Sequence, residues 1–183
     1  SPPTLSSAAS DVYKRQGVSK VFYAPGWRIG YLAIHDPKKR LLHIRDGIER
    51  LLRSRLCAST PAQIGYLAGL DSDRTWMKSY SDKVIRQRDL CVRRIAEIEG
   101  LEVQSAGGAF YMFVRLTDEK WSNDDKEFVL QLLHEEHVLV VHGSGFSPEL
   151  GRGHFRIVFL PDEDVLDEAF NRIERFLIRH RDY

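Results

Sequence analysis

Cysteine is scarce in this sequence, with only Cys57 and Cys91 among 183 residues. They form no Cys-x-x-Cys motif and are too few for a disulfide framework, so we expect a reduced, cytoplasmic protein. Neither sign of charge is in excess, because 27 Lys and Arg stand against 26 Asp and Glu. That balance argues against nucleic acid or an anionic membrane as a partner. No apolar run approaches the roughly 18 residues that a membrane-spanning helix needs.

Apolar residues make up 43% of the chain, which is an ordinary share for a globular protein. The length allows one domain or two small ones. Residues 1–16 differ from the rest, because they are rich in Ser, Ala and Pro and show neither a helical nor a strand period. They lack the positive start and apolar core of a secretory signal, and the first residue is not Met. We expect residues 1–16 to be a non-native or disordered head.

The pattern that follows the head predicts an α/β fold. The stretch 18–34 is rich in β-branched and aromatic residues and is interrupted by Pro25-Gly26, which predicts two short strands around a turn. Apolar stripes predict one helix that opens at Asp36-Pro37 and a second that begins near Pro61. These stripes need a covering surface, and we expect them to stay exposed in this chain.

The second half of the chain alternates short strands with helices. A long helix capped by Ser72 is expected to reach about Ile98, where Gly100 stops it. Ser122 and Asp125 match a capping box for the next long helix. The last helix begins after Pro161. The expected strands cover residues 101–104, 109–116, 138–141 and 154–160. We therefore expect two domains, residues 17–75 and 76–183, with the boundary in or near the long helix.

Three basic residues are candidates for chemistry. Lys20 lies among apolar neighbours, so it is either a solvated residue at an edge or a desolvated amine suited to forming a Schiff base. Arg28, flanked by glycines and Trp27, is either a surface residue or a phosphate ligand. Arg156 is either on the exposed face of an edge strand or a bidentate clamp for a carboxylate.

The glycine-rich loop before the last strand offers weaker candidates. His142 and Ser144 either touch a ligand or cap an ordinary turn. His142 and His154 have no metal-ligand spacing with Cys or carboxylates, so no metal site is expected. The glycines of the loop match neither the dinucleotide fingerprint nor the P-loop.

Four segments together resemble a known family. GVSKVFYAPGWRIG at 17–30 resembles the lysine segment of the class I/II pyridoxal-phosphate aminotransferases of fold type I. GGAFYMF at 107–113 resembles a strand of that family, HGSGF at 142–146 its glycine-rich loop, and HFRIVFLP at 154–161 its substrate-carboxylate segment. The four occur in the family's order, and the combination looks closest to the alanine-aminotransferase-like branch.

The resemblance implies a role for each basic candidate. Lys20 would hold pyridoxal 5'-phosphate as an internal aldimine and move the substrate proton. Arg28 would bind the cofactor phosphate, and Arg156 would bind the α-carboxylate of the substrate. The reaction would transfer an amino group between an α-amino acid, alanine or similar, and a 2-oxo acid. Gly17 replaces a serine found in many relatives, so one phosphate contact would be missing.

The resemblance also implies that this chain is an incomplete, inactive fragment. Family members are roughly twice as long or longer, and the chain resembles their carboxyl-terminal part: the end of the large domain plus the small α/β domain. The complete protein would be a homodimer. Two alternatives remain for it: a β-lyase on the same fold, which would keep all three basic residues, or the aminotransferase-like domain of a transcription regulator, which would carry a helix-turn-helix upstream.

Overall fold

The computed structural model describes residues 12–181. The chain forms two compact units that divide between Asp73 and Arg74, two residues before the boundary that the sequence predicts. Residues 1–11, which make up most of the expected head, lie outside the described range. We describe each unit by itself.

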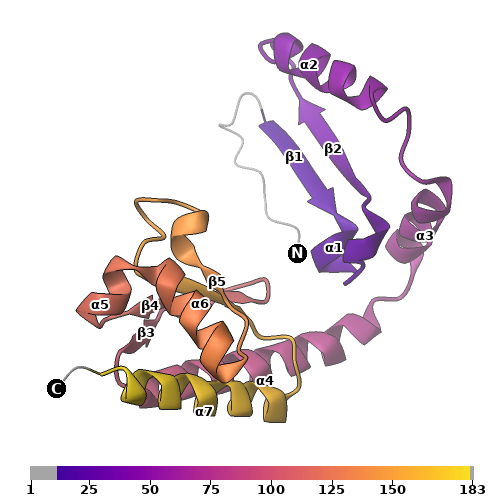
Figure 1. Cartoon of the computed structure of the whole chain (residues 1–183). Coiled ribbons are helices and arrows are strands. Elements are labelled where there is room, and N and C mark those ends of the chain that lie inside the picture. The colour runs from indigo at the N-terminus through magenta and orange to yellow at the C-terminus, as the bar shows by residue number, and fades with distance from the viewer. Residues whose placement is uncertain (1–11, 182–183) are drawn as a thin grey trace. The chain divides into compact units, whose positions relative to one another are not determined.

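The first unit is built on an antiparallel pair of strands, which lie side by side in Figure 1. The strands β1 (Val12–Gly17) and β2 (Gly30–His35) pair from Val12 opposite His35 to Gly17 opposite Gly30. Between them the chain makes a short helix and a 3-10 turn, and after them come two longer helices: α1 (Val18–Val21), η1 (Pro25–Trp27), α2 (Leu42–Arg53) and α3 (Thr60–Asp71).

Two expectations for the first unit differ from the structure. The disorder that is one of the two alternatives for the head does not extend to residues 12–16, because they pair with β2, which gives their backbone groups hydrogen-bond partners. The strand expected just after Gly17 is instead the helical turn α1. Val18 is 1% exposed there, and its carbonyl accepts from the Phe22 N–H at 2.9 Å.

The helices of the first unit bury few apolar side chains. Among the described residues α2 buries none, and α3 buries only Ala62. The exposed apolar side chains follow the stripes that the sequence shows: Leu42, Ile44, Leu51, Leu52, Ile64, Leu67 and Leu70. As expected, these stripes are uncovered.

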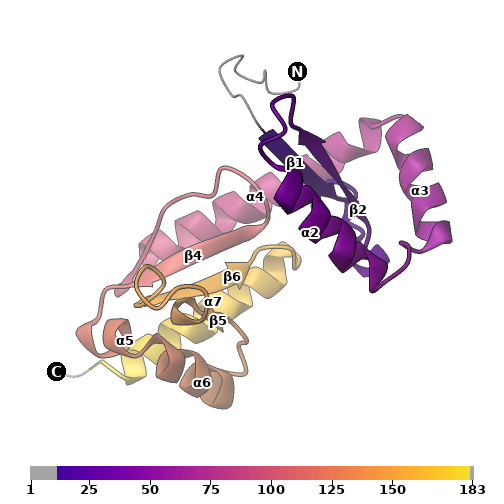
Figure 2. The same cartoon turned by 90° about the horizontal axis from the view of Figure 1, so that it is seen from above.

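The second unit is a four-stranded sheet with helices. Its strand order is β3-β4-β6-β5, every neighbouring pair is antiparallel, and β4 and β6 lie side by side in Figure 2. In chain order its elements are α4 (Thr75–Glu97), β3 (Leu101–Val103), β4 (Tyr111–Leu116), α5 (Glu119–Asn123), α6 (Asp125–Glu136), β5 (Val141–His142), η2 (Gly143–Gly145), β6 (His154–Val158) and α7 (Glu163–Arg179).

One face of this sheet carries the core. Along β4 and β6 the buried and more exposed residues alternate, as expected for a sheet covered on one side. The side chains that the helices cover include aromatic rings in mutual contact: Phe128 lies 5.1 Å from Phe155 and 5.6 Å from Phe176, centroid to centroid. The opposite face carries Tyr111, Phe113, Arg115, His154, Arg156 and Val158.

The helix starts in the second unit differ from two expectations. Asp124, not Ser122, caps α6, because its side chain accepts from the Glu127 N–H at 3.0 Å. A separate short helix, α5, holds Ser122. Ser72 ends α3 and does not begin α4, whose first residue is Thr75.

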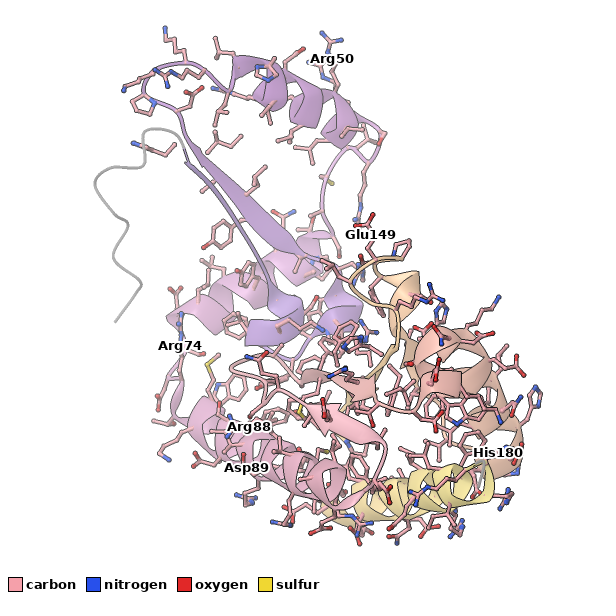
Figure 3. The ribbon with its side chains drawn as sticks, turned by 90° about the vertical axis from the view of Figure 1, so that its left-hand side faces the viewer. Arg50, Arg74, Arg88, Asp89, Glu149 and His180 are labelled. Atoms are coloured by element: carbon pink, nitrogen blue, oxygen red, sulfur yellow. The ribbon has the colours of Figure 1, made fainter. Side chains whose placement is uncertain are left out.

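Ion pairs join α6 to α7 at the edge of the core. The buried Glu136 accepts from Arg175 and from Arg179, each at 2.9 Å. Next to it Glu135 contacts His180, which Figure 3 labels at the end of α7. The hydrogen bond from His180 lowers the pKa of Glu135. None of the helices in the described range is both long and apolar enough to cross a membrane.

The two cysteines are predicted to differ sharply in reactivity. Cys91 is 0% exposed, and burial raises the pKa of its thiol to about 12, whereas Cys57 is exposed. Iodoacetamide should label Cys57 in the folded chain and reach Cys91 only after denaturant unfolds the second unit. Mass spectrometry of the two peptides measures this, and equal labelling rates in buffer would show that the second unit does not protect Cys91.

The glycine-rich loop before β6 is predicted to tolerate no side chain at Gly143. A Cβ there would collide with the Gly151 carbonyl oxygen and lie 2.9 Å from the His154 Cβ. We expect Gly143→Ala to lower the free energy of unfolding of the second unit by about 1–3 kcal/mol. Gly107→Ala is the control, because a Cβ at Gly107 would meet nothing within 4 Å. Chemical denaturation followed by tryptophan fluorescence compares the two, and equal losses would contradict the prediction.

Candidate functional site

Lys20 lies on α1, a helix of four residues at the end of β1. Its side chain is exposed, so the described part of the first unit does not desolvate the amine. Of the two interpretations that the sequence left open, the solvated one describes Lys20 within this unit. The neighbouring Val18 is buried and fixes the turn that carries Lys20.

Two glycines of α3 anchor the segment that carries Lys20 and Arg28. The Phe22 ring lies 3.1 Å from where a Cβ of Gly69 would be, and the Trp27 ring occupies the space that a Cβ of Gly65 would need. Phe22 also makes an edge-on contact with Tyr66, with ring centroids 5.7 Å apart. A glycine pair four residues apart lies on one face of a helix, and that spacing was the sequence signal for this contact.

Arg28 ends the 3-10 turn in a left-handed backbone conformation, with φ at 52°. Such a conformation costs a non-glycine residue roughly 1 kcal/mol and is found at functional turns more often than elsewhere. Its Nη1 donates to the Pro25 carbonyl at 3.1 Å. The side chain is exposed and forms no ion pair with a carboxylate of the described residues, so guanidinium N–H groups remain for an anion.

The backbone brings the two basic segments of the first unit together. Gly17 pairs with Gly30, and the Val18 N–H donates to the Ile29 carbonyl at 3.2 Å. The turn that carries Lys20 therefore adjoins the residue after Arg28. An amine and a guanidinium on adjoining turns are a donor set that suits an aldehyde and a phosphate group.

Arg156 lies in the second unit, on the open face of the sheet. Its strand β6 is an interior strand between β4 and β5, so the interpretation of Arg156 as an edge-strand residue is wrong. The guanidinium carbon lies 4.7 Å from the ring centroid of Tyr111 and 4.4 Å from that of Phe146. Phe113, opposite Arg156 on β4, also contacts the Phe146 ring, with centroids 5.4 Å apart.

The aromatic rings hold a guanidinium that lacks a polar partner. The Arg156 Nε is buried without a hydrogen bond, and no carboxylate in the described range forms an ion pair with Arg156. Leaving a buried donor unpaired is costly, and a planar guanidinium is suited to a bidentate bond with a carboxylate. The arrangement is therefore one that suits an anion of carboxylate type.

Sequence reasoning missed the part that Tyr111 and Phe146 play. Both belong to segments that the family resemblance singled out, but neither was named as a contact of Arg156. The signal was present for Tyr111, because strand alternation places it and Phe113 on one face, and antiparallel pairing brings such a face together with its neighbour. Nothing in the sequence places Phe146, which depends on the fold of the loop.

His142 and Ser144 form a turn. The His142 Nδ1 accepts from the Gly145 N–H at 3.1 Å and lies 3.0 Å from the Ser144 Oγ. Of the two interpretations given for these residues, the geometry favours the capped turn. The turn precedes Phe146 directly and so bears on the position of its ring.

Comparisons with known proteins agree on one family. The model of the class I and II aminotransferases matches residues 5–173, beginning inside the stretch expected to be a non-native head. The chain is 34% identical over 172 residues to a glutamate-pyruvate aminotransferase of Haemophilus influenzae. It is 33% identical over 186 residues to an alanine aminotransferase of Mycobacterium tuberculosis.

Solved structures give the same result. An alanine aminotransferase from Pyrococcus furiosus superimposes with a TM-score of 0.85 at 46% identity over 93% of this chain. An Escherichia coli aminotransferase gives 0.85 at 30% identity over 94% of it.

The matches cover most of this chain but less than half of each relative. They cover 90% and 97% of this chain for the two curated relatives, but only 41% and 42% of those proteins. For the two solved structures the share of the other chain is 43%. The chain thus spans less than half the length of these relatives. Because the family model matches most of its residues, the chain belongs to the class I and II aminotransferases.

Proposed function

We propose that this chain is part of a pyridoxal-phosphate-dependent aminotransferase that moves an amino group between an α-amino acid, alanine or similar, and a 2-oxo acid. The observation that carries the proposal is the Arg156 guanidinium, which contacts the rings of Tyr111 and Phe146 and has a buried, unpaired Nε. Both substrates of such a reaction carry a carboxylate beside the reacting carbon. The similarity to proteins named alanine aminotransferase supports the choice of amino acid.

The chain corresponds, in this proposal, to the carboxyl-terminal part of the fold. The first unit is the end of the large domain, and the second is the small α/β domain. The exposed apolar stripes of α2 and α3 support this division, because they need a surface to cover them. The remainder of a family-length chain, more than half of it, would supply that surface. The complete enzyme is proposed to be a homodimer.

The first unit holds the residues for the cofactor. Lys20 is the proposed attachment point and the group that moves the proton at the substrate Cα. Arg28 binds the phosphate with the N–H groups that its bond to Pro25 leaves available. Pyridoxal phosphate, when bound, supplies an electron sink for the bonds to that carbon. The amine of Lys20 must be desolvated by parts of the enzyme beyond this unit, since it is exposed here.

The second unit binds and orients the substrate. The guanidinium carbon of Arg156 lies over the rings of Tyr111 and Phe146, and contacts with ring faces leave the N–H groups in the guanidinium plane for a carboxylate. Rings that already hold the guanidinium reduce the entropy that substrate binding would otherwise cost. The carboxylate fixes one end of the substrate and thereby places the Cα.

The first test is a chimera in which this chain replaces the segment it matches in the Pyrococcus furiosus alanine aminotransferase. We expect the chimera to exchange amino groups between alanine and 2-oxoglutarate, and borohydride reduction to fix the cofactor on the peptide with Lys20. Lys20→Ala should abolish turnover, whereas Lys78→Ala, which removes an exposed surface lysine, should not. The 183-residue chain alone should neither retain pyridoxal phosphate on gel filtration nor turn over. Cofactor fixed on another lysine would contradict the assignment.

The second test concerns the carboxylate clamp in the same chimera. Arg156→Lys keeps the charge but loses the planar fork, so the KM for alanine should rise about tenfold or more, with cofactor content unchanged. Arg115→Lys is the matched control, because Arg115 lies on the same open face and pairs with Glu102 at 2.8 Å. An unchanged KM in Arg156→Lys would show that another group binds the carboxylate.

A further inference from the structure

The loop that carries Phe146 onto Arg156 is held by its own backbone. The Phe146 N–H donates to the Gly143 carbonyl at 2.9 Å, and the Gly151 N–H donates to the Ser147 carbonyl at 2.9 Å. Glu149, labelled in Figure 3, lies on this loop between η2 and β6. These bonds give the loop its internal shape. They do not fasten it to the rest of the second unit.

A hydrogen bond to Asp125 connects the loop to helix α6. It lies in the first turn of α6, is 3% exposed, and its Oδ2 accepts from the Ser144 N–H at 2.7 Å. The helix itself does not need this carboxylate as its cap, because Asp124 already fills that role. Burying a carboxylate is costly unless it is hydrogen-bonded, and a bond from an N–H to a charged acceptor is among the stronger ones.

The bonds within the loop and the bond to Asp125 both bear on the position of Phe146. Ser144 is two residues before Phe146, within the turn that the His142 side chain closes. Fixing the Ser144 N–H therefore fixes the start of the segment from which the Phe146 ring reaches Arg156. His142, at the start of the turn, is held by its pairing with Phe155 on β6, whereas the Ser144 end of the turn is held by this bond to α6. The ring contact at 4.4 Å depends on the position of the turn.

We propose that Asp125 is a positioning residue for substrate binding. Through the Ser144 N–H it holds the turn that lays Phe146 on Arg156, and so keeps the guanidinium in the plane in which it meets a carboxylate. The effect of Asp125 on substrate binding rests on the proposed function. Its effect on the surroundings of Arg156 does not. Asp125 touches neither Arg156 nor the substrate, and acts through Ser144 and Phe146.

The experiment compares Asp125→Ala, Asp125→Asn and Asp124→Ala. Asn keeps an oxygen that can accept from Ser144, so it is the rescue variant. Asp124→Ala removes the cap of the same helix, at a cost of about 1 kcal/mol, without touching the loop. In the 183-residue chain, the Arg156 Nε–H resonance reports the rings on the guanidinium through their ring currents. It is assigned by its loss in Arg156→Lys, and pyruvate is then titrated.

We expect Asp125→Ala to move the Nε–H resonance toward its position in Phe146→Ala and to weaken pyruvate binding about threefold to fivefold, the size of one exposed cation–π contact. Asp125→Asn and Asp124→Ala should match the parent chain. In the chimera the KM for alanine should rise in Asp125→Ala with little change in kcat. An unchanged resonance in a folded Asp125→Ala, or an equal shift in Asp124→Ala, would overturn the proposal.

If Asp125→Ala misfolds, Asp125→Asn and Ser144→Pro test the proposal instead. Ser144→Pro deletes the N–H that donates to Asp125. If Ser144→Pro leaves the Arg156 resonance in place, the bond does not position the loop and the proposal is wrong. If the parent chain and the chimera both fail to bind or use a carboxylate substrate, the proposed function fails. In that case the Arg156 Nε–H resonance of the variants still shows whether Asp125 holds the loop.

Discussion

Burial of the second unit's sheet on one face is the constraint on which the candidate carboxylate site depends. The aromatic cluster of Phe128, Phe155 and Phe176 fixes which face of β4 and β6 is turned inward. Alternation along each strand then leaves the other residues on the open face, Arg156 among them. A shift of one residue in the register of β6 would turn the guanidinium into the core and Phe155 out of it. The same packing that stabilises the unit therefore places the Arg156 guanidinium, whose buried Nε has no hydrogen-bond partner, on this face.

The first unit depends on a different constraint, the packing of two aromatic rings against two glycines of α3. Gly65 and Gly69 let Trp27 and Phe22 lie against α3, and these rings hold the turn that carries Lys20 and Arg28. The helices around this anchor expose most of their apolar side chains. The segment with Lys20 and Arg28 is thus held in place while its surroundings stay uncovered. This is consistent with a chain that spans less than half the length of its relatives.

The sequence predicted the long elements well, because each has a long apolar period. The helices α4, α6 and α7 and the strands β4 and β6 lie close to their expected positions. Short elements were harder. The residues after Gly17 have strand propensity but form a helical turn, because Val18 becomes buried and Phe22 packs on α3. The stretch 138–141 was expected to be a strand, yet only Val141–His142 pair with β6. Its apolar residues are typical of either state, and partner strands decide between them.

The basic residues Lys20, Arg28 and Arg156 were all identifiable from the sequence, since their chemistry and their neighbours in the chain are local properties. The family also followed from short motifs in a fixed order. Only the tertiary structure placed the rings of Tyr111 and Phe146 against Arg156 and brought the Asp125 carboxylate to the Ser144 N–H. These partners are separated by 45, 10 and 19 residues in the chain. Contacts of that kind depend on strand register and loop position, which no local pattern of residues encodes.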